Sequence, residues 1–261
     1  MTYSMTHIAP TIAEVLEIRS PADGEQQAIP EIISDLAGEN RLVALVVDAL
    51  GEAQLHRFAD HMPFLWSWCR RRCVTLKSTM PSITPVNFAT MVSGCDLDGH
   101  GVRSKDLDFT CETVFDMLEE AGEQGAGCGR PTYTGGQLLA RFAQIDGTAA
   151  VADDAGVEEA VMRIADEEAP RFIIAQIGGT DDHFHRFGPN SPRMIPKLRE
   201  ADWRIQHMSA ELGRLGYAVL IFADHGQHDS GNPEKMGTHG TECDEDCLVP
   251  CTWLTAREAI R

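Results

Sequence analysis

Three long apolar runs, each leading into an aspartate, constrain the fold more than any other feature of the sequence. They cover residues 42–47, 172–177 and 218–222, and they open onto Asp48, Asp181 and Asp224. Continuous runs rich in β-branched residues are typical of central parallel strands that are buried on both faces. Open α/β sheets bind their ligands at the carboxyl ends of such strands. The sequence therefore predicts that the three aspartates meet at one edge of a sheet.

Helical patterns separate these strands. Residues 157–168 have apolar residues at helical spacing, and a helix with one apolar face starts near residue 191 and ends between residues 213 and 216. Short strands are expected at 74–76 and 248–254, and turns at 122–136. Strands that alternate with helices indicate an α/β fold with a mostly parallel central sheet and helices on both faces. We expect one domain over residues 1–261, with residues 1–40 as a peripheral N-terminal segment.

Charge and hydropathy exclude several classes of function. The net charge of −18 would repel the backbone of a nucleic-acid polymer. No window approaches the 18 or so consecutive apolar residues of a membrane span. The first twenty residues lack the basic start and apolar run of a signal peptide. We therefore expect a cytoplasmic protein without a nucleic-acid or membrane partner, in which metal ions neutralise some of the excess carboxylates.

Three histidines accompany the three aspartates. His185 lies four residues after Asp181, His225 follows Asp224 directly, and His239 comes shortly afterwards. Three carboxylates and three imidazoles on one edge can hold two divalent cations. A single aspartate after a strand is more often a helix cap, but this pattern occurs three times. Two alternatives stay open: Asp182 competes with Asp181 for the ligand role, and His183 is at most a supporting residue.

Thr84 is the candidate nucleophile. Thr84 and Pro85 are typical of an N-cap and a first helical position, and Gly94 is typical of the stop, so a helix of about ten residues is expected from Thr84. A threonine hydroxyl is inert at neutral pH unless a metal or base lowers its pKa. The helix N-terminus adds positive potential for an anionic oxygen. The plain alternative is that Thr84 only caps the helix.

Five segments in this order resemble the alkaline phosphatase superfamily, especially its type I phosphodiesterase and nucleotide pyrophosphatase branch, with phosphonoacetate hydrolase nearby. The resemblance covers residues 42 to about 255. Its segments are Val46–Gly51, Pro81–Asn87, Asp181–Pro189, Ala223–Gly226 and Gly237–Gly240.

The resemblance implies a phosphoester hydrolase with two divalent metal ions, zinc or in its place manganese or iron. One ion would be held by Asp181, His185 and His239. The other would be held by Asp48, Asp224, His225 and the Thr84 oxygen. Thr84 would attack phosphorus in a small phosphorylated substrate, and water would cleave the resulting phosphothreonine. Two such cations stabilise both the attacking and the leaving oxygen.

The chain departs from the family at two places. Lys105 stands where the family has an asparagine that touches phosphate, and a cation there would favour a more negatively charged substrate, such as a monoester or a phosphonate. Together with Asn87, Lys105 is a substrate-binding candidate; the alternative is an exposed loop lysine. Only thirteen residues separate His225 from His239, so the cap of the diesterase branch is missing.

Several alternatives remain from the sequence alone. The scaffold could act on phosphonates, transfer phosphate or hydrolyse sulfate esters, although residue 84 is not the cysteine or serine of formylglycine sulfatases. A catalytically silent metal-binding protein is the alternative from another class, and a homo-oligomer stays open. Cys243, Cys247 and Cys251 could hold an extra metal, but a strand over 248–254 would put them on different faces, which favours a packing role.

Overall fold

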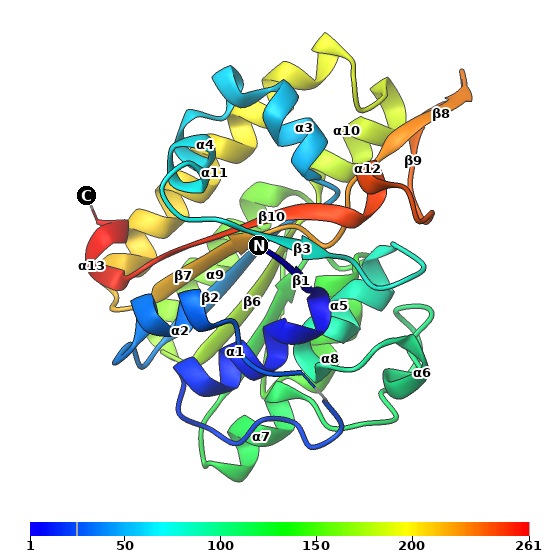
Figure 1. Ribbon diagram of the computed structural model, residues 1–261. Helices are drawn as coiled ribbons and strands as arrows, with labels where there is room; N and C mark the ends of the chain where they lie inside the picture. Colours follow the sequence, from blue (N-terminus) through cyan, green and yellow to red (C-terminus); the bar gives the residue numbers. More distant parts are fainter. Residues whose placement is uncertain (25, 261) are drawn as a thin grey trace.

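An eight-stranded sheet forms the centre of the computed structural model, which describes residues 1–24 and 26–260 (Figure 1). Strand β10 is antiparallel to both of its neighbours, and the other neighbouring pairs are parallel. Strands β8 (His228–Asn232) and β9 (Lys235–Thr238) form a separate antiparallel hairpin. Across the main sheet the order is β1 (Thr2–Ser4), β3 (Val74–Lys77), β10 (Leu248–Leu254), β7 (Ala218–Phe222), β2 (Leu42–Val47), β6 (Phe172–Ile177), β4 (Gly125–Gly129) and β5 (Ile145–Thr148).

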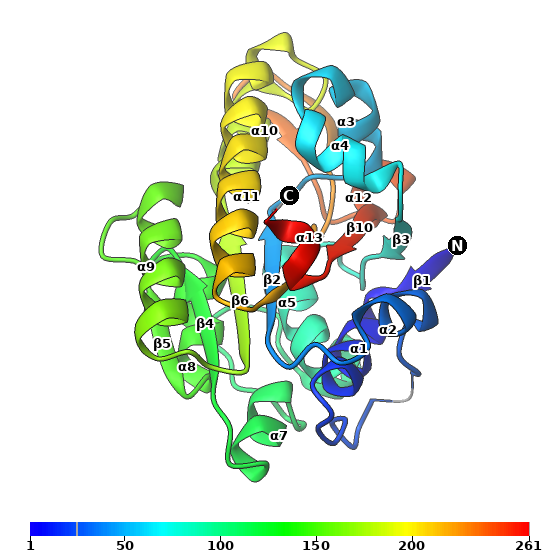
Figure 2. The ribbon, with the colours of Figure 1, turned by 90° about the vertical axis from the view of Figure 1, so that its left-hand side faces the viewer.

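Helices cover both faces of this sheet (Figure 2). The longer helices α9 and α11 lie on one face, and α1, α5 and α7 lie on the other. The mostly parallel α/β fold with helices on both faces is confirmed. The α-helices are α1 (Ile8–Val15), α2 (Pro30–Leu36), α3 (Glu52–Arg57), α4 (Pro63–Cys69), α5 (Thr84–Ser93), α6 (Leu97–His100), α7 (Val114–Glu120), α8 (Ala140–Phe142), α9 (Asp154–Glu167), α10 (Gly179–Phe187), α11 (Ile195–Arg214), α12 (Asp244–Cys247) and α13 (Ala256–Ala259).

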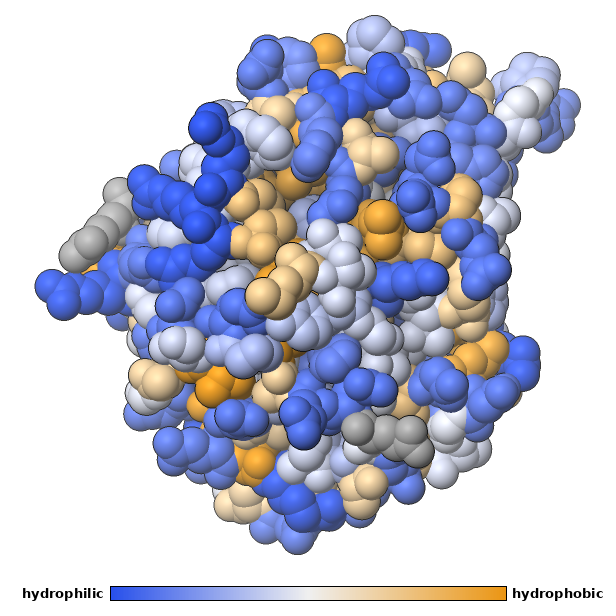
Figure 3. Space-filling model, in the orientation of Figure 1, coloured by the Kyte–Doolittle hydropathy of each residue, from blue (hydrophilic) through white to orange (hydrophobic). Residues whose placement is uncertain are grey.

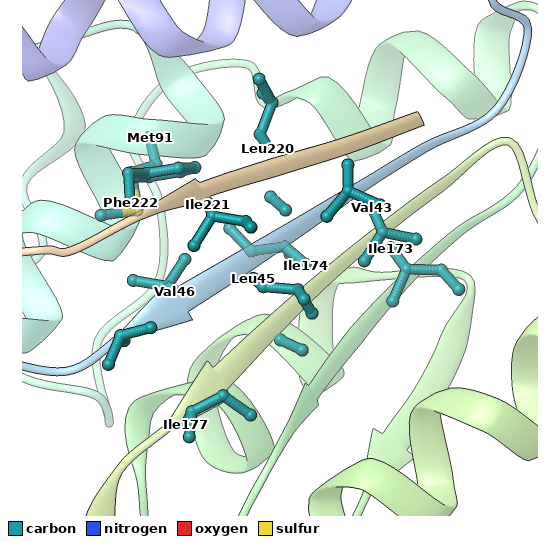
Figure 4. Packing of buried hydrophobic residues seen from close by; sticks show 14 of the residues in the cluster. Val43, Leu45, Val46, Met91, Ile173, Ile174, Ile177, Leu220, Ile221 and Phe222 are labelled. Carbon is teal, nitrogen blue, oxygen red and sulfur yellow. The ribbon is translucent and has the colours of Figure 1, made fainter. Parts of the chain in front are cut away.

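The three apolar runs form the central strands β7, β2 and β6, with the predicted bounds. Every residue of these strands is buried, and their side chains pack against both helical layers (Figure 4). Because Leu42 is in register with Phe172 and Ala218, the three strands end at nearly the same level. The aspartates that follow them therefore lie at one edge of the sheet, as the sequence predicts.

Strand β4 corrects the prediction of turns at 122–136. Strand β4 has the sequence Gly-Ala-Gly-Cys-Gly, which lacks the β-branched residues of an ordinary strand signal. A Cβ on Gly127 would lie 2.4 Å from the backbone carbon of Leu139, and one on Gly129 would lie 2.6 Å from the Gly136 nitrogen. These glycines let the helical turn 135–139 pack directly onto the strand backbone. Tertiary packing, rather than local preference, decides this strand.

The prediction that residues 1–40 are a peripheral segment is also wrong. Strand β1 extends the main sheet beside β3. Helix α1 packs against α5, and all its residues except Glu14 are buried. The described part of residues 1–40 therefore supports the helix that begins with Thr84.

The face of the molecule that Figure 3 shows is mostly hydrophilic, with apolar residues scattered over it rather than gathered in one large patch. Within the described ranges, no helix combines the length and the apolar character needed to cross a bilayer.

Candidate metal centre and active site

Six side chains gather in two groups at the carboxyl edge of the sheet. The first group is Asp181, His185 and His239, and the second is Asp48, Asp224 and His225. Within each group the possible ligand atoms lie within 4.8 Å of one another. The rings of His225 and His239 are stacked with their centroids 3.9 Å apart, so the two groups are neighbours.

The elements explain this convergence. Asp48 directly follows β2, and Asp224 and His225 come just after β7. Helix α10 starts at the end of β6 and turns Asp181 and His185 to the same side, because residues four apart share a helix face. Nε2 of His185 lies 3.3 Å from Oδ1 of Asp181. His239 follows the β8–β9 hairpin, which is formed within the thirteen residues between His225 and His239.

The three imidazoles present the same nitrogen to the carboxylates. Nδ1 of His185, His225 and His239 lies 2.8 to 3.0 Å from a backbone carbonyl oxygen. A carbonyl only accepts hydrogen bonds, so in the neutral rings Nδ1 carries the proton and Nε2 carries the lone pair. Metal-binding histidines use this arrangement, in which the second nitrogen donates to the protein and fixes the ring.

Two carboxylate oxygens in this cluster, Oδ1 of Asp48 and Oδ2 of Asp224, are buried and have no hydrogen-bond partner among the described residues. Nε2 of His225 faces both, at 3.7 Å and 3.3 Å. The other oxygens are held in place. Oδ2 of Asp48 accepts from Gln176 at 2.5 Å, and Oδ1 of Asp224 accepts from the backbone nitrogens of Ala49 and His225. Unpaired oxygens that face a lone pair are destabilising unless a cation lies between them.

The pKa shifts of the clustered side chains also indicate a place for a cation. Burial raises the pKa of Asp48 well above its usual value, and the neighbouring charges of Asp224 and Asp181 raise it further. Burial also raises the pKa of Asp181. The pKa of His239 falls to about 2, chiefly because of burial and then because of His225. A divalent cation would reverse these penalties and keep the carboxylates ionised. The donor set of carboxylates and imidazoles therefore fits divalent metal ions.

Thr84 lies beside the second group. Its Oγ1 is 3.2 Å from Nε2 of His225. Helix α5 begins at Thr84 and ends at Gly94 in a left-handed conformation, as predicted. One detail is corrected: the N-cap is Ile83, so Thr84 is the first helical residue and its side chain does not cap the helix. Its hydroxyl therefore does not cap the helix and lies beside the second group of candidate ligands.

Lys105 and Thr84 line the same cavity. This cavity has a volume of about 370 Å³, and Thr84, Asp48, Lys105 and Tyr133 contribute to its wall. The ammonium of Lys105 donates to the carbonyl of Thr132. Lys105 therefore faces the space in front of Thr84, where a substrate would bind.

Asn87 has a different place from the one expected of a substrate ligand. It is fully buried, and its Oδ1 accepts from the nitrogen of Thr79 at 2.7 Å. Its Nδ2 donates to the carbonyls of Thr79 and Ile83, both at 3.2 Å. All these bonds hold the loop that leads to Thr84, so the structure gives Asn87 a role in shaping the loop rather than in contacting substrate.

The open choice between Asp181 and Asp182 is resolved by geometry. Asp182 belongs to neither group of candidate ligands. Its carboxylate accepts from Nη1 of Arg130 at 2.8 Å and from the hydroxyl of Tyr133. Nδ1 of His183 lies 2.8 Å from the carbonyl of Gly179, within its own helix. Asp181 is thus the residue that belongs to the cluster.

Two glutamines of the site were missed from the sequence. Gln176 donates to Asp48, and Gln227 donates to Oδ1 of Asp181 at 2.6 Å. Gln176 did leave a signal, because it is the only polar residue in the run 172–177. A buried amide in a central strand needs a partner, and the nearby aspartate supplies it. Gln227 left no comparable signal.

Comparison with known proteins places this geometry in context. Residues 132–244 match the family model of type I phosphodiesterase / nucleotide pyrophosphatase. The matched segment contains Asp181, His185, Asp224, His225 and His239, whereas Asp48 and Thr84 lie outside it and join the site through the fold. No curated protein matches the chain.

Solved structures share the fold at low sequence identity. Phosphonoacetate hydrolase from Sinorhizobium meliloti 1021, in complex with phosphonoformate, has a TM-score of 0.56 at 20% identity, over 72% of this chain and 56% of that one. Murine ectonucleotide pyrophosphatase / phosphodiesterase 5 has a TM-score of 0.58 at 14% identity, over 72% and 58%. The human counterpart has a TM-score of 0.54 at 15% identity, over 72% and 57%. The chain thus spans little more than half the length of these structures, and its alkaline phosphatase-like fold is confirmed.

Proposed function

We propose that this chain is a metal-dependent hydrolase that cleaves phosphate esters through a phosphothreonine formed on Thr84 at a two-zinc site. The observation that carries the proposal is the position of the Thr84 hydroxyl, 3.2 Å from the His225 nitrogen that faces the unpaired oxygens of Asp48 and Asp224. The family match over residues 132–244 and the alkaline phosphatase-like fold support the same class of reaction.

Two sets of residues would hold the ions. Asp181, His185 and His239 would hold one, and Asp48, Asp224, His225 and the Thr84 oxygen would hold the other. When bound, such cations supply positive charge that lowers the pKa of an alcohol or water and neutralises phosphoryl oxygens. Zinc suits a mixed imidazole and carboxylate set, and manganese or iron could replace it.

The chain's own groups account for the remaining chemistry. Thr84 Oγ1 forms a bond to phosphorus while the bond to the leaving oxygen breaks, and the hydroxyl proton leaves to solvent. Water then attacks the phosphothreonine, and the Thr84 oxygen departs with a proton. The N-terminus of α5 favours negative charge on the reacting oxygens, because the helix dipole is positive there.

The pocket in front of Thr84 favours a small, strongly anionic substrate. Its volume of about 370 Å³ fits a compact phosphorylated molecule. Lys105 brings a positive charge to its wall, which favours a phosphate monoester or a phosphonate over a singly charged diester. Phosphonate hydrolysis is the second candidate function, and this lysine is the observation that favours it. The net charge of −18 argues against nucleic-acid polymers as substrates.

The test compares three variants with the wild type on p-nitrophenyl phosphate, bis(p-nitrophenyl) phosphate, p-nitrophenyl sulfate and phosphonoacetate. Thr84→Ala should keep the fold and the bound zinc but lose turnover. Thr84→Ser should keep part of the turnover, because it retains a hydroxyl. Thr110→Ala is the matched control, since this threonine hydroxyl donates to Gly99 outside the pocket wall.

A phosphorylated intermediate gives the second readout. Acid-quenched wild type should carry one phosphoryl group on the peptide that contains Thr84, and Thr84→Ala should carry none. Normal turnover by Thr84→Ala would refute the covalent route. A zinc-loaded wild type that hydrolyses none of the four substrates would instead favour a catalytically silent metal-binding protein.

A further inference from the structure

A third group of metal-binding side chains lies outside the two described above. His228 starts strand β8, Cys243 precedes helix α12 and Asp246 belongs to α12. One ligand atom from each lies within 4.8 Å of the others. The hairpin and α12 lie beside each other in Figure 1, although 14 residues separate His228 from Cys243. The group therefore joins strand β8, which precedes His239, to helix α12, which follows it.

The geometry around His228 has an unusual feature: two acceptors share one ring nitrogen. Nδ1 of His228 lies 2.8 Å from Oδ1 of Asp246 and 3.8 Å from Sγ of Cys243. One N–H group cannot donate well to both. A cysteine nucleophile of the Cys-His-Asp kind needs its thiol and its carboxylate on opposite ring nitrogens. The arrangement is therefore not a catalytic triad, but a single cation could serve all three groups at this point.

The carboxylate that faces this point is held rigidly. Asp246 is fully buried, and its Oδ2 accepts from the nitrogen and the hydroxyl of Thr241 at 2.9 Å and 2.8 Å. Its backbone carbonyl accepts from the nitrogen of Gly226 at 2.8 Å. With these bonds in place, Oδ1 can point only toward His228 and Cys243. The hydroxyl of Thr241 also lies 3.2 Å from Sγ of Cys243.

We propose that His228, Cys243 and Asp246 form a third metal site, which binds zinc. In a tetrahedral zinc site with ordinary bond lengths, sulfur and nitrogen ligands lie ~3.6 Å apart, and nitrogen and oxygen ligands ~3.4 Å apart. The observed 3.8 Å and 2.8 Å differ by a few tenths of an ångström, so only a small movement of the partly exposed His228 ring is required. A thiolate and a carboxylate together balance the charge of a divalent cation. The fourth position would be open to water or to the hydroxyl of Thr241.

This site would support the segment that carries His239. Asp246 binds the backbone at Thr241, two residues after His239, and at Gly226, one residue after His225. An ion that fixes Asp246 to Cys243 and β8 would hold both histidine-bearing segments without the missing cap. This site would bind its ion independently of Thr84 chemistry, and of the three cysteines near the C-terminus it contains only Cys243. Cys251 is buried in β10, and Cys247 donates to the carbonyl of Thr241.

Cobalt(II) tests this site separately from the two-metal centre. A cobalt–thiolate bond gives a charge-transfer absorption in the near ultraviolet, and the two groups at the sheet edge contain no cysteine. Metal-free protein titrated with cobalt(II) should develop this band with one equivalent per chain. Cys243→Ser should lose the band and bind one equivalent less, while the d–d absorption of the other sites remains. His228→Gln should bind cobalt at this site at least tenfold more weakly.

The matched control is Cys111→Ser, which removes another partly buried thiol and should leave the band unchanged. Circular dichroism of each variant establishes that it is folded. Absence of a thiolate band in the wild type, or an undiminished band in folded Cys243→Ser, would overturn the proposal. A wild type that develops the thiolate band but binds only one equivalent of cobalt would count against the two-metal centre instead.

Discussion

Asp224→Asn should have opposite effects on the metal-free and the zinc-loaded protein. Without metal, two buried carboxylates repel each other, and Oδ2 of Asp224 lies unpaired 3.3 Å from Nε2 of His225. An amide at this position removes the charge and can donate to that nitrogen, while its oxygen keeps the bonds to Ala49 and His225. With zinc, the same change removes a ligand. We therefore expect a more stable metal-free protein that gains less from zinc.

The size of the effect follows from the distance between the carboxylates. The ligand oxygens of Asp48 and Asp224 lie within 4.8 Å of each other. At an effective dielectric constant of about 20, two unit charges at that distance repel by about 3.5 kcal/mol. Partial protonation of Asp48, whose pKa is raised, lowers the net gain, so we expect about 2–3 kcal/mol. For a chain of this size that corresponds to a rise in Tm of about 4–5 °C.

The assay is thermal unfolding at pH 8, followed by circular dichroism, with EDTA and with excess zinc. The matched control is Asp202→Asn, because this buried carboxylate accepts from the backbone nitrogens of Phe64 and Leu65, away from the metal groups. The control should lose stability equally in both conditions. A metal-free Asp224→Asn protein that is less stable than the metal-free wild type would refute the reasoning.

Three further predictions concern other sites. Lys105→Met should raise KM for phosphate monoesters about tenfold more than for a singly charged diester, because it removes a cation from the pocket wall; equal changes for both substrates would contradict its charge role. Burial lowers the pKa of His100 to about 4, below the value of about 6.5 for an unfolded histidine. The unfolded chain therefore binds an extra proton between these values, and stability should fall as the pH drops from 6.5 toward 4; His100→Gln should flatten this dependence in urea unfolding curves. Gly127→Ala should lower Tm by about 4–5 °C in calorimetry, because overpacking against the backbone of Leu139 costs about 2–3 kcal/mol, and an unchanged Tm would contradict this packing.

The sequence predicted those parts of the molecule in which local pattern and tertiary structure agree. Strands β2, β6 and β7 are apolar throughout, and a strand buried on both faces requires this pattern. The bounds of α5 followed from Thr84, Pro85 and Gly94, because proline and glycine restrict where a helix begins and ends. The convergence of the six metal-binding candidates then follows from parallel strands that end at one edge.

Other features depend on contacts that are distant in sequence. Strand β4 is formed by glycines that admit a neighbouring turn, and no strand propensity marks it. Helix α1 looked peripheral because its burial against α5 is visible only in the fold. Asn87 looked like a substrate ligand because its motif contains the candidate nucleophile Thr84, yet its amide bonds to Thr79 and Ile83. The role of Gln227 likewise depends on the turn that brings it to Asp181.

Anomalous diffraction at the zinc edge, on crystals grown with zinc, tests the central claim most directly. We expect one peak among Asp181, His185 and His239, and a second among Asp48, Asp224 and His225 within coordination distance of the Thr84 oxygen. A map with no peak in either group, or with Thr84 Oγ1 turned away from an occupied site, would contradict this account.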